Sequence, residues 1–145
     1  MSCNLLYKIE QSDFWRLQDE QYSIDLRYNK KAQSLRVNTE PKELFFLERT
    51  GLFKSRVLFK SEYDQLVGEL QFTRNYRTGT IRVAESEWQF EIDAQGITLI
   101  DLQTRMVKRI SVSLLPQLET NEFAALVFTY AKIQLAQVRR PAAVS

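Results

Sequence analysis

The sequence contains no histidine and only one cysteine, Cys3. Because histidine is the usual general base near neutral pH, its absence excludes Ser-His-Asp and Cys-His nucleophilic catalysis. Histidine is also the commonest zinc and iron ligand, and a single cysteine can form neither an intrachain disulfide nor a thiolate cluster. We therefore expect no enzyme activity, no metal and no cofactor. The cysteine usage favours a cytoplasmic protein, or the cytoplasmic face of something larger. No acylation motif surrounds Cys3, which is interpreted as an ordinary thiol.

Glycine and proline are scarce, at four and three residues, so low-complexity linkers are absent. The 20 basic and 18 acidic residues leave a net charge of +2, which gives no reason to expect nucleic-acid binding. The N-terminus has no apolar core of the kind that a signal peptide needs. The 145 residues are 44% hydrophobic and suit one domain, 1–140, followed by a flexible tail, 141–145.

Short runs of alternating apolar and polar residues fill most of the chain. In the clearest run, residues 87–93, aromatic and aliphatic side chains fall on one face and polar ones on the other, as in a half-buried strand. We expect similar strands over 53–60, with Phe53 on the buried face, and over 66–72. About eleven such runs are separated by short turns, which predict antiparallel hairpins rather than parallel crossovers.

One segment, Asn121 to Gln137 (NEFAALVFTYAKIQLAQ), is strongly helical. It is apolar around most of its circumference, so it must be buried on nearly every side. It would rise about 25 Å, and its polar residues and its length do not fit a transmembrane span. We expect a less apolar stripe to face a gap in the sheet, or water at one end. This stripe comprises Glu122, Ala125, Thr129 and Lys132.

These features predict a mainly β protein. The expected fold is a single closed antiparallel barrel of about 11–12 strands around the C-terminal apolar helix, at about 121–137. Eight strands enclose only side chains, whereas more strands leave room for a helix about 10 Å across. The structural alternative is a PH-like barrel capped by a C-terminal helix, but this chain has too many strands for it. A helix inside the barrel occupies the usual ligand cavity, so ligands are expected on the outer wall, at a barrel mouth or in the loops.

The order of elements, short antiparallel strands followed by an apolar helix, resembles the tubby C-terminal-like superfamily, which includes tubby domains, phospholipid scramblases and LURP-one-related proteins. The supporting motifs are Asp64-x-x-x-Gly68-x-Leu70, Ala94-Gln95-Gly96, and Arg109-Ile110-Ser111-Val112 leading into Asn121-Glu122-Phe123-Ala124-Ala125-Leu126. The resemblance implies a twelve-stranded barrel around a central helix and, in some members, association with phosphoinositides or membrane lipids. A tubby-type set of phosphoinositide-binding cations cannot be placed residue by residue. The scramblase-type proline-rich segment, cysteine cluster and fully apolar terminal helix are missing.

Basic side chains alternate along the expected 53–60 strand and should share its outer face. Others lie in the expected strand and turn that follow. Together they form a candidate patch for phosphate headgroups. The alternative is an ordinary solvated strand face that also discourages edge pairing. The predicted basic patch comprises Lys54, Arg56, Lys60, Arg74, Arg77 and Arg82.

A second basic group is expected at the rim where the helix leaves the barrel. Arg139 and Arg140 follow the last helical turn, and Arg105, Lys108 and Arg109 complete the group. This rim would meet an anionic surface, or it would simply complement the helix dipole.

The carboxylates Glu87 and Glu91 lie about 13 Å apart on one strand face, too far for paired-carboxylate catalysis. The sequence therefore predicts a non-enzymatic cytoplasmic binding module without a transmembrane span. By one hypothesis it is peripheral to the membrane and binds anionic lipid headgroups, or another phosphorylated ligand, through the outer basic face. The alternative is a protein-interaction or structural domain with no small-molecule ligand.

Overall fold

The computed structural model describes residues 4–8, 14–18, 23–38, 42–112 and 118–139. Within these residues the chain forms eleven strands, a short 3-10 helix η1 (Leu52–Lys54) and a C-terminal helix α1 (Thr120–Arg139). The predicted mainly β fold with one C-terminal helix is confirmed. The strands are β1 (Asn4–Lys8), β2 (Phe14–Gln18), β3 (Ser23–Asn29), β4 (Ser34–Asn38), β5 (Glu43–Thr50), β6 (Arg56–Ser61), β7 (Leu66–Phe72), β8 (Thr78–Val83), β9 (Ser86–Asp93), β10 (Gly96–Asp101) and β11 (Val107–Val112).

Each strand pairs antiparallel with the next one along the chain, and the neighbours follow the order β1-β11-β10-β9-β8-β7-β6-β5-β4-β3-β2. The pair β1–β11 is parallel, with Asn4 opposite Ile110. The prediction of an exclusively antiparallel sheet is therefore wrong at this pair. The physical reason is parity, because strands that alternate in direction leave the first and the eleventh pointing the same way.

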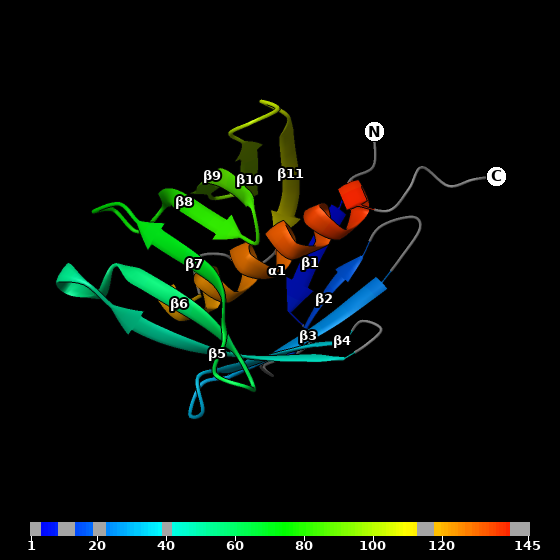
Figure 1. Cartoon of the computed structure of the whole chain (residues 1–145). Helices are drawn as coiled ribbons and strands as arrows, with labels where there is room; N and C mark the ends of the chain where they lie inside the picture. The colour runs from blue at the N-terminus through cyan, green and yellow to red at the C-terminus, as the bar shows by residue number, and fades with distance from the viewer. Residues whose placement is uncertain (1–3, 9–13, 19–22, 39–41, 113–117, 140–145) are drawn as a thin grey trace.

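The sheet curves around α1, as Figure 1 shows. All side chains from Phe123 to Ala131 are buried, so this part of the helix has no exposed face. The ring of Phe128 stacks on Phe59 of β6 at 4.1 Å between centroids and meets Phe45 of β5 edge-on at 5.0 Å. The expectation of a helix buried on nearly every side is confirmed.

The less apolar stripe of α1 differs from the expectation. Ala125 and Thr129 are buried, and the Thr129 hydroxyl donates to the Ala125 carbonyl at 2.8 Å. A hydroxyl that bonds back to its own helix can be buried without an unpaired donor. Lys132 is half-buried, with its Nζ 3.4 Å from a Glu43 carboxylate oxygen and 4.9 Å from the centroid of the Phe45 ring. At Thr129 the prediction of a gap or water is therefore wrong.

The predicted strand over 53–60 begins later than expected. Val57 and Phe59 are buried as predicted, but Phe53 is 81% exposed in η1, and β6 starts only at Arg56. Gly51, Phe53 and Lys54 all have positive φ, at 83°, 57° and 53°. These left-handed residues turn the chain before β6, so Lys54 does not share the outer face of that strand.

Some predictions concern residues outside the described part of the chain. These are the interpretation of Cys3 as an ordinary thiol, the position of Arg140 and the tail 141–145. The helix, predicted over about 121–137, runs from Thr120 to Arg139. The side chain of Arg139 also lies outside what the structure describes.

Candidate functional site

The predicted basic patch divides into two groups with different surroundings. Arg56, Lys60 and Arg82 lie on strands, and carboxylates neutralise them. Glu69 accepts from Arg56 at 2.9 Å and from Arg82 at 2.8 Å, while Glu48 lies 2.8 Å from Lys60. The hydrogen bond with Glu48 raises the pKa of Lys60. Basic and acidic groups therefore alternate on the outer face of β6 and β7 and offer no continuous positive surface.

The other members of the patch lie in the β5–β6 turn (50–55) and the β7–β8 turn (73–77), here called the hairpin tip. Both turns project beyond the start of α1 in Figure 1. Among the described residues, neither Lys54 nor Arg74 forms an ion pair. The guanidinium of Arg77 lies 4.8 Å from the centroid of the Phe123 ring in the first turn of the helix. The tip therefore carries positive charge next to the helix N-terminus.

Hydrogen bonds hold the two turns of the hairpin tip together. The Tyr76 hydroxyl donates to the Phe53 carbonyl at 2.8 Å. The Arg49 guanidinium donates to the Lys54 carbonyl at 2.9 Å through Nε and lies 5.9 Å from the centroid of the Tyr76 ring. Side chains from both hairpins thus hold the main-chain carbonyls of Phe53 and Lys54 in place. The hairpin tip is therefore held together by hydrogen bonds between its two turns.

Two large apolar side chains protrude from the hairpin tip. Leu52 is 78% exposed and Phe53 is 81% exposed. The left-handed backbone costs a bulky residue such as Phe53 about 1–2 kcal/mol. Phe53 is therefore exposed to water and also has an unfavourable backbone conformation. Residues with strained backbones are concentrated at functional sites.

The charge around the hairpin tip has one sign along the sequence. Segments 49–61 and 70–84 contain seven lysines and arginines and no aspartate or glutamate. Leu52, Phe53 and Arg49 were not among the predicted site residues. The signal for them was the segment without acidic residues that runs from Arg49 to Ser61. The period-2 alternation hid this signal, because it placed Phe53 on the buried face.

The second predicted basic group is only partly described. Arg109 of β11 donates to Asp93 at 2.9 Å and to the Thr98 hydroxyl at 2.7 Å. Hydrogen bonds from Arg109 and from the backbone N–H of Gln95 lower the pKa of Asp93 to about 2. Arg109 is therefore held by a carboxylate and is not free for a ligand, whereas Lys108 is exposed on the same strand.

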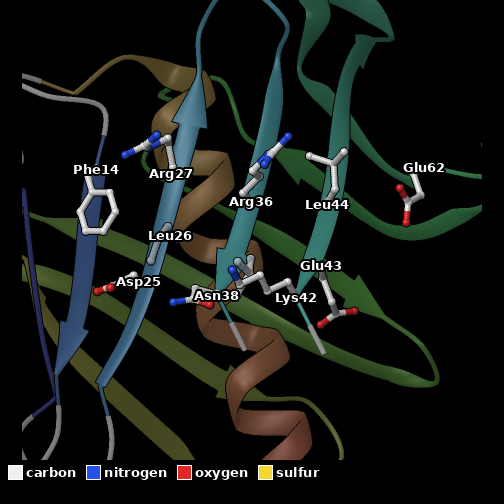
Figure 2. A pocket seen from close by; sticks show the side chains of 11 residues that line it. Phe14, Asp25, Leu26, Arg27, Arg36, Asn38, Lys42, Glu43, Leu44 and Glu62 are labelled. Atoms are coloured by element: carbon white, nitrogen blue, oxygen red, sulfur yellow. The ribbon is translucent and has the colours of Figure 1, made fainter. Parts of the chain in front are cut away.

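A separate hollow lies on the outer wall across β2, β3, β4 and β5 (Figure 2). Its volume is about 390 Å³. Strand register sets Phe14, Arg27, Arg36 and Leu44 side by side in one row. None of these residues was predicted as a site residue. The hollow is lined by Phe14, Asp25, Leu26, Arg27, Arg36, Val37, Asn38, Lys42, Glu43, Leu44 and Glu62.

Comparison with protein-family models, with curated proteins and with solved structures found no match. In the part of the chain that the structure describes, no helix combines the length and the hydropathy needed to cross a bilayer. The same residues include no cluster of three or more metal-ligating side chains.

Proposed function

We propose that the chain is a non-enzymatic binding module that associates with anionic membrane lipids through the hairpin tip. The observation that carries this proposal is the exposure of Leu52 and Phe53 in the same turn as Lys54, with Arg74 in the second turn of the hairpin tip. Neither cation forms an ion pair among the described residues. Localisation at the cytoplasmic side, peripheral to the membrane, belongs to the same proposal.

The chemistry of the hairpin tip matches the two layers of a membrane surface. Apolar side chains of peripheral proteins enter the boundary between headgroups and acyl chains, to a depth of about 5–10 Å. Each lysine or arginine near an anionic leaflet contributes about 1 kcal/mol. Leu52 and Phe53 supply the apolar part, and Lys54 and Arg74 supply the charge. A soluble anionic ligand would account for the cations but not for the protruding side chains.

The hydrogen bonds that restrain the backbone of the hairpin tip support the same proposal. A flexible tip would lose conformational freedom on binding, and this loss weakens association. Here the hydrogen bonds from Tyr76 and Arg49 already fix the carbonyls of Phe53 and Lys54. The tip is therefore pre-organised for contact with a surface.

We further interpret the pairings as a barrel closed around α1. Two facts support this interpretation: β1 has both β2 and β11 as neighbours, and the helix is buried on all sides from Phe123 to Ala131. The same order of elements supports the resemblance to the tubby C-terminal-like superfamily. The described residues form eleven strands, one fewer than that resemblance implies.

The alternative function, a protein-interaction or structural domain without a small ligand, is favoured by one specific observation. The outer face of β6 and β7 mixes paired charges, with Glu69 between Arg56 and Arg82. Such a surface suits a protein partner better than a uniformly anionic membrane. The two functions make opposite predictions for binding to lipid vesicles.

The first test is co-sedimentation of the full chain with phosphatidylcholine vesicles, with and without phosphatidylserine. We expect binding only with the anionic lipid. Replacing Lys54 and Arg74 by glutamine should weaken it roughly 30-fold, because two cations contribute about 2 kcal/mol. The matched control replaces Arg56 and Arg82 by glutamine, which removes the same charge from the paired strand face. Equal weakening by the control, or no binding by the unaltered chain, would favour the alternative function.

A second pair of variants tests the apolar side chains. Phe53→Asn and Leu52→Asn should each weaken vesicle binding about tenfold or more, because each removes a side chain that lipid would bury. Of the two positions, only Phe53 has a positive φ, a conformation that asparagine adopts at lower cost than phenylalanine. We therefore expect the free energy of unfolding of the Phe53→Asn variant to rise by about 1 kcal/mol while its vesicle binding falls. Unchanged vesicle binding in both variants would remove the apolar contact from the proposal and leave a purely electrostatic one.

A further inference from the structure

Two arginines occupy paired strand positions on the wall of the hollow, and neither forms an ion pair within the described residues. Figure 2 shows their guanidinium groups directed apart, with that of Arg27 toward Phe14. Arg27 on β3 and Arg36 on β4 are directly opposite in the strand register, and both are exposed. Side chains at such positions lie about 5 Å apart at their Cβ atoms, and like charges there destabilise the strand pair. This pairing of like charges is unfavourable by itself, and an anion toward which both guanidinium groups turn would make it favourable.

The carboxylates of the hollow are mostly committed elsewhere. Asp25 accepts from Arg16 at 2.8 Å, and Glu43 lies 3.4 Å from Nζ of Lys132. Within the described residues, neither the two arginines nor Lys42 forms an ion pair. Three cations of the hollow therefore lack a neutralising group of their own.

The remaining carboxylate, Glu62, lies beyond Leu44 as seen from Arg36 in Figure 2. On the other side, the guanidinium of Arg27 lies 5.3 Å from the centroid of the Phe14 ring. This contact restrains the guanidinium. The volume of about 390 Å³ falls within the usual range for small-ligand sites.

We propose that this hollow binds a small ligand bearing an oxyanion, a carboxylate or a phosphate group. Arg27 and Arg36 hold the oxyanion, because guanidinium groups present paired N–H donors that fit such groups. Lys42 adds a third charge, and Phe14 and Leu44 flank the two arginines in the same row, where they offer apolar surface to the remainder of the ligand. The site is independent of the hairpin tip, since Leu44 and the last residue of β5 are about 20 Å apart along the strand.

The test is a titration of the isotopically labelled full chain, followed by backbone amide NMR signals, with inorganic phosphate and separately with succinate. We expect saturable shifts confined to residues 25–27, 36–38 and 42–44. Saturation by phosphate alone assigns a phosphate group, saturation by succinate alone assigns a carboxylate, and saturation by both assigns the shared oxyanion. Shifts that are linear or spread over the whole surface with both probes would overturn the proposal.

Two variants locate the site. Arg36→Gln should weaken the affinity for the saturating probe about 10- to 100-fold, the effect of losing hydrogen bonds to a charged group. It should also raise the melting temperature without ligand, because it removes the repulsion from Arg27. Arg82→Gln is the matched control, an outward arginine that already pairs with Glu69. Equal weakening by both variants would mean that net charge alone attracts the probe. Arg36→Gln should leave vesicle binding unchanged. The proposal for the hollow and the proposal for the hairpin tip can therefore be rejected independently of each other.

Discussion

At the level of single residues, the conformation of Gly51 determines what the hairpin tip presents. Its φ of 83° and ψ of −179° are accessible to glycine at low cost and to few other residues. The turn that it starts carries Phe53 and Lys54 into the left-handed region and directs Leu52 and Phe53 to solvent. Since a strand would have placed Phe53 in the core, one backbone conformation decides whether this side chain stabilises the fold or remains available for a partner.

Another residue-scale feature is the Asp93 carboxylate, which accepts hydrogen bonds from Arg109 and from the backbone N–H groups of Gln95 and Gly96. Its pKa in the folded protein, about 2, is below the ordinary value of 3.8. A carboxylate with a depressed pKa stabilises the fold above its unfolded pKa, and this contribution is lost as the pH falls toward the folded value. The relevant window is therefore about pH 4 to pH 2.

We predict that Asp93→Asn lowers the free energy of unfolding at pH 7 by about 0.5–1 kcal/mol, the range for a largely exposed ion pair. The asparagine oxygen can still accept from the two backbone N–H groups, so the change keeps the turn and removes the charge together with the second acceptor for Arg109. Denaturant unfolding at several pH values should show that the difference in free energy of unfolding between the unaltered chain and the variant decreases toward pH 2. Glu87→Gln, on the same strand and without an ion pair among the described residues, is the control. A difference that persists at pH 2 would contradict the electrostatic origin.

At the level of elements, α1 and the sheet fit together because Gly68 has no side chain. A Cβ atom at this position would lie 2.6 Å from Cε1 of Phe128, closer than side chains approach in folded proteins. Gly68 is opposite Phe59 in the β6–β7 pairing, and Phe59 stacks on the same Phe128 ring. The glycine in β7 therefore makes room for the aromatic residue of the helix.

We predict that Gly68→Ala lowers the free energy of unfolding by about 1–3 kcal/mol, the usual effect of overpacking. Adding Phe128→Leu should recover part of this loss, so that the double variant is less destabilised than the sum of the single ones. Chemical denaturation of the four proteins measures this coupling. Leu66→Ala, at the exposed start of the same strand, should change stability by only about 0.5 kcal/mol. If the effects of the two substitutions on the free energy of unfolding were strictly additive, the methyl group of the alanine at position 68 would not contact the Phe128 ring.

At the level of the whole molecule, α1 is packed against several strands of the sheet that are far apart in the sequence. Phe128 packs on β5 and β6, and Arg77 of the β7–β8 turn lies over Phe123. Ala125 and Val127 project from α1 about 200° apart, and both are buried. A helix lying on an open sheet would leave one of these two positions in water.

We predict that Ala125→Asp and Val127→Asp both abolish the cooperative unfolding transition. A buried, unpaired carboxylate costs several kcal/mol, against a total stability of about 5–15 kcal/mol. Circular dichroism during thermal unfolding measures the effect. Leu52→Asp at the hairpin tip should keep a transition close to that of the unaltered chain. Tolerance of either helix variant would mean that one side of α1 is open to solvent.

How far the fold was predictable depends on how local its signals are. The alternation in 87–93 and the apolar circumference of 121–137 are local patterns, and Trp88, Phe90 and the helix from Phe123 are buried as expected. The parallel pairing of β1 with β11 and the neutralisation of Arg56 by Glu69 depend on contacts between distant segments. Of the predicted basic patch, Lys54 and Arg74 remain without an ion pair in the described residues. The pattern of apolar and polar residues could not distinguish these two cations from the paired ones. It predicts which face of a strand a side chain lies on, but not which side chain forms an ion pair with it.

The sequence by itself determined the mainly β composition, the position of the helix and the lack of histidine-based chemistry, because these follow from residue types and from periods of two and 3.6 residues. Only the tertiary structure decided which charges remain unpaired and where Phe53 points. It also brought Arg27 opposite Arg36, since strand register joins residues that no short sequence motif connects. Both proposed sites arise at this level, where the turn at Gly51 and the β3–β4 register determine which side chains share a surface.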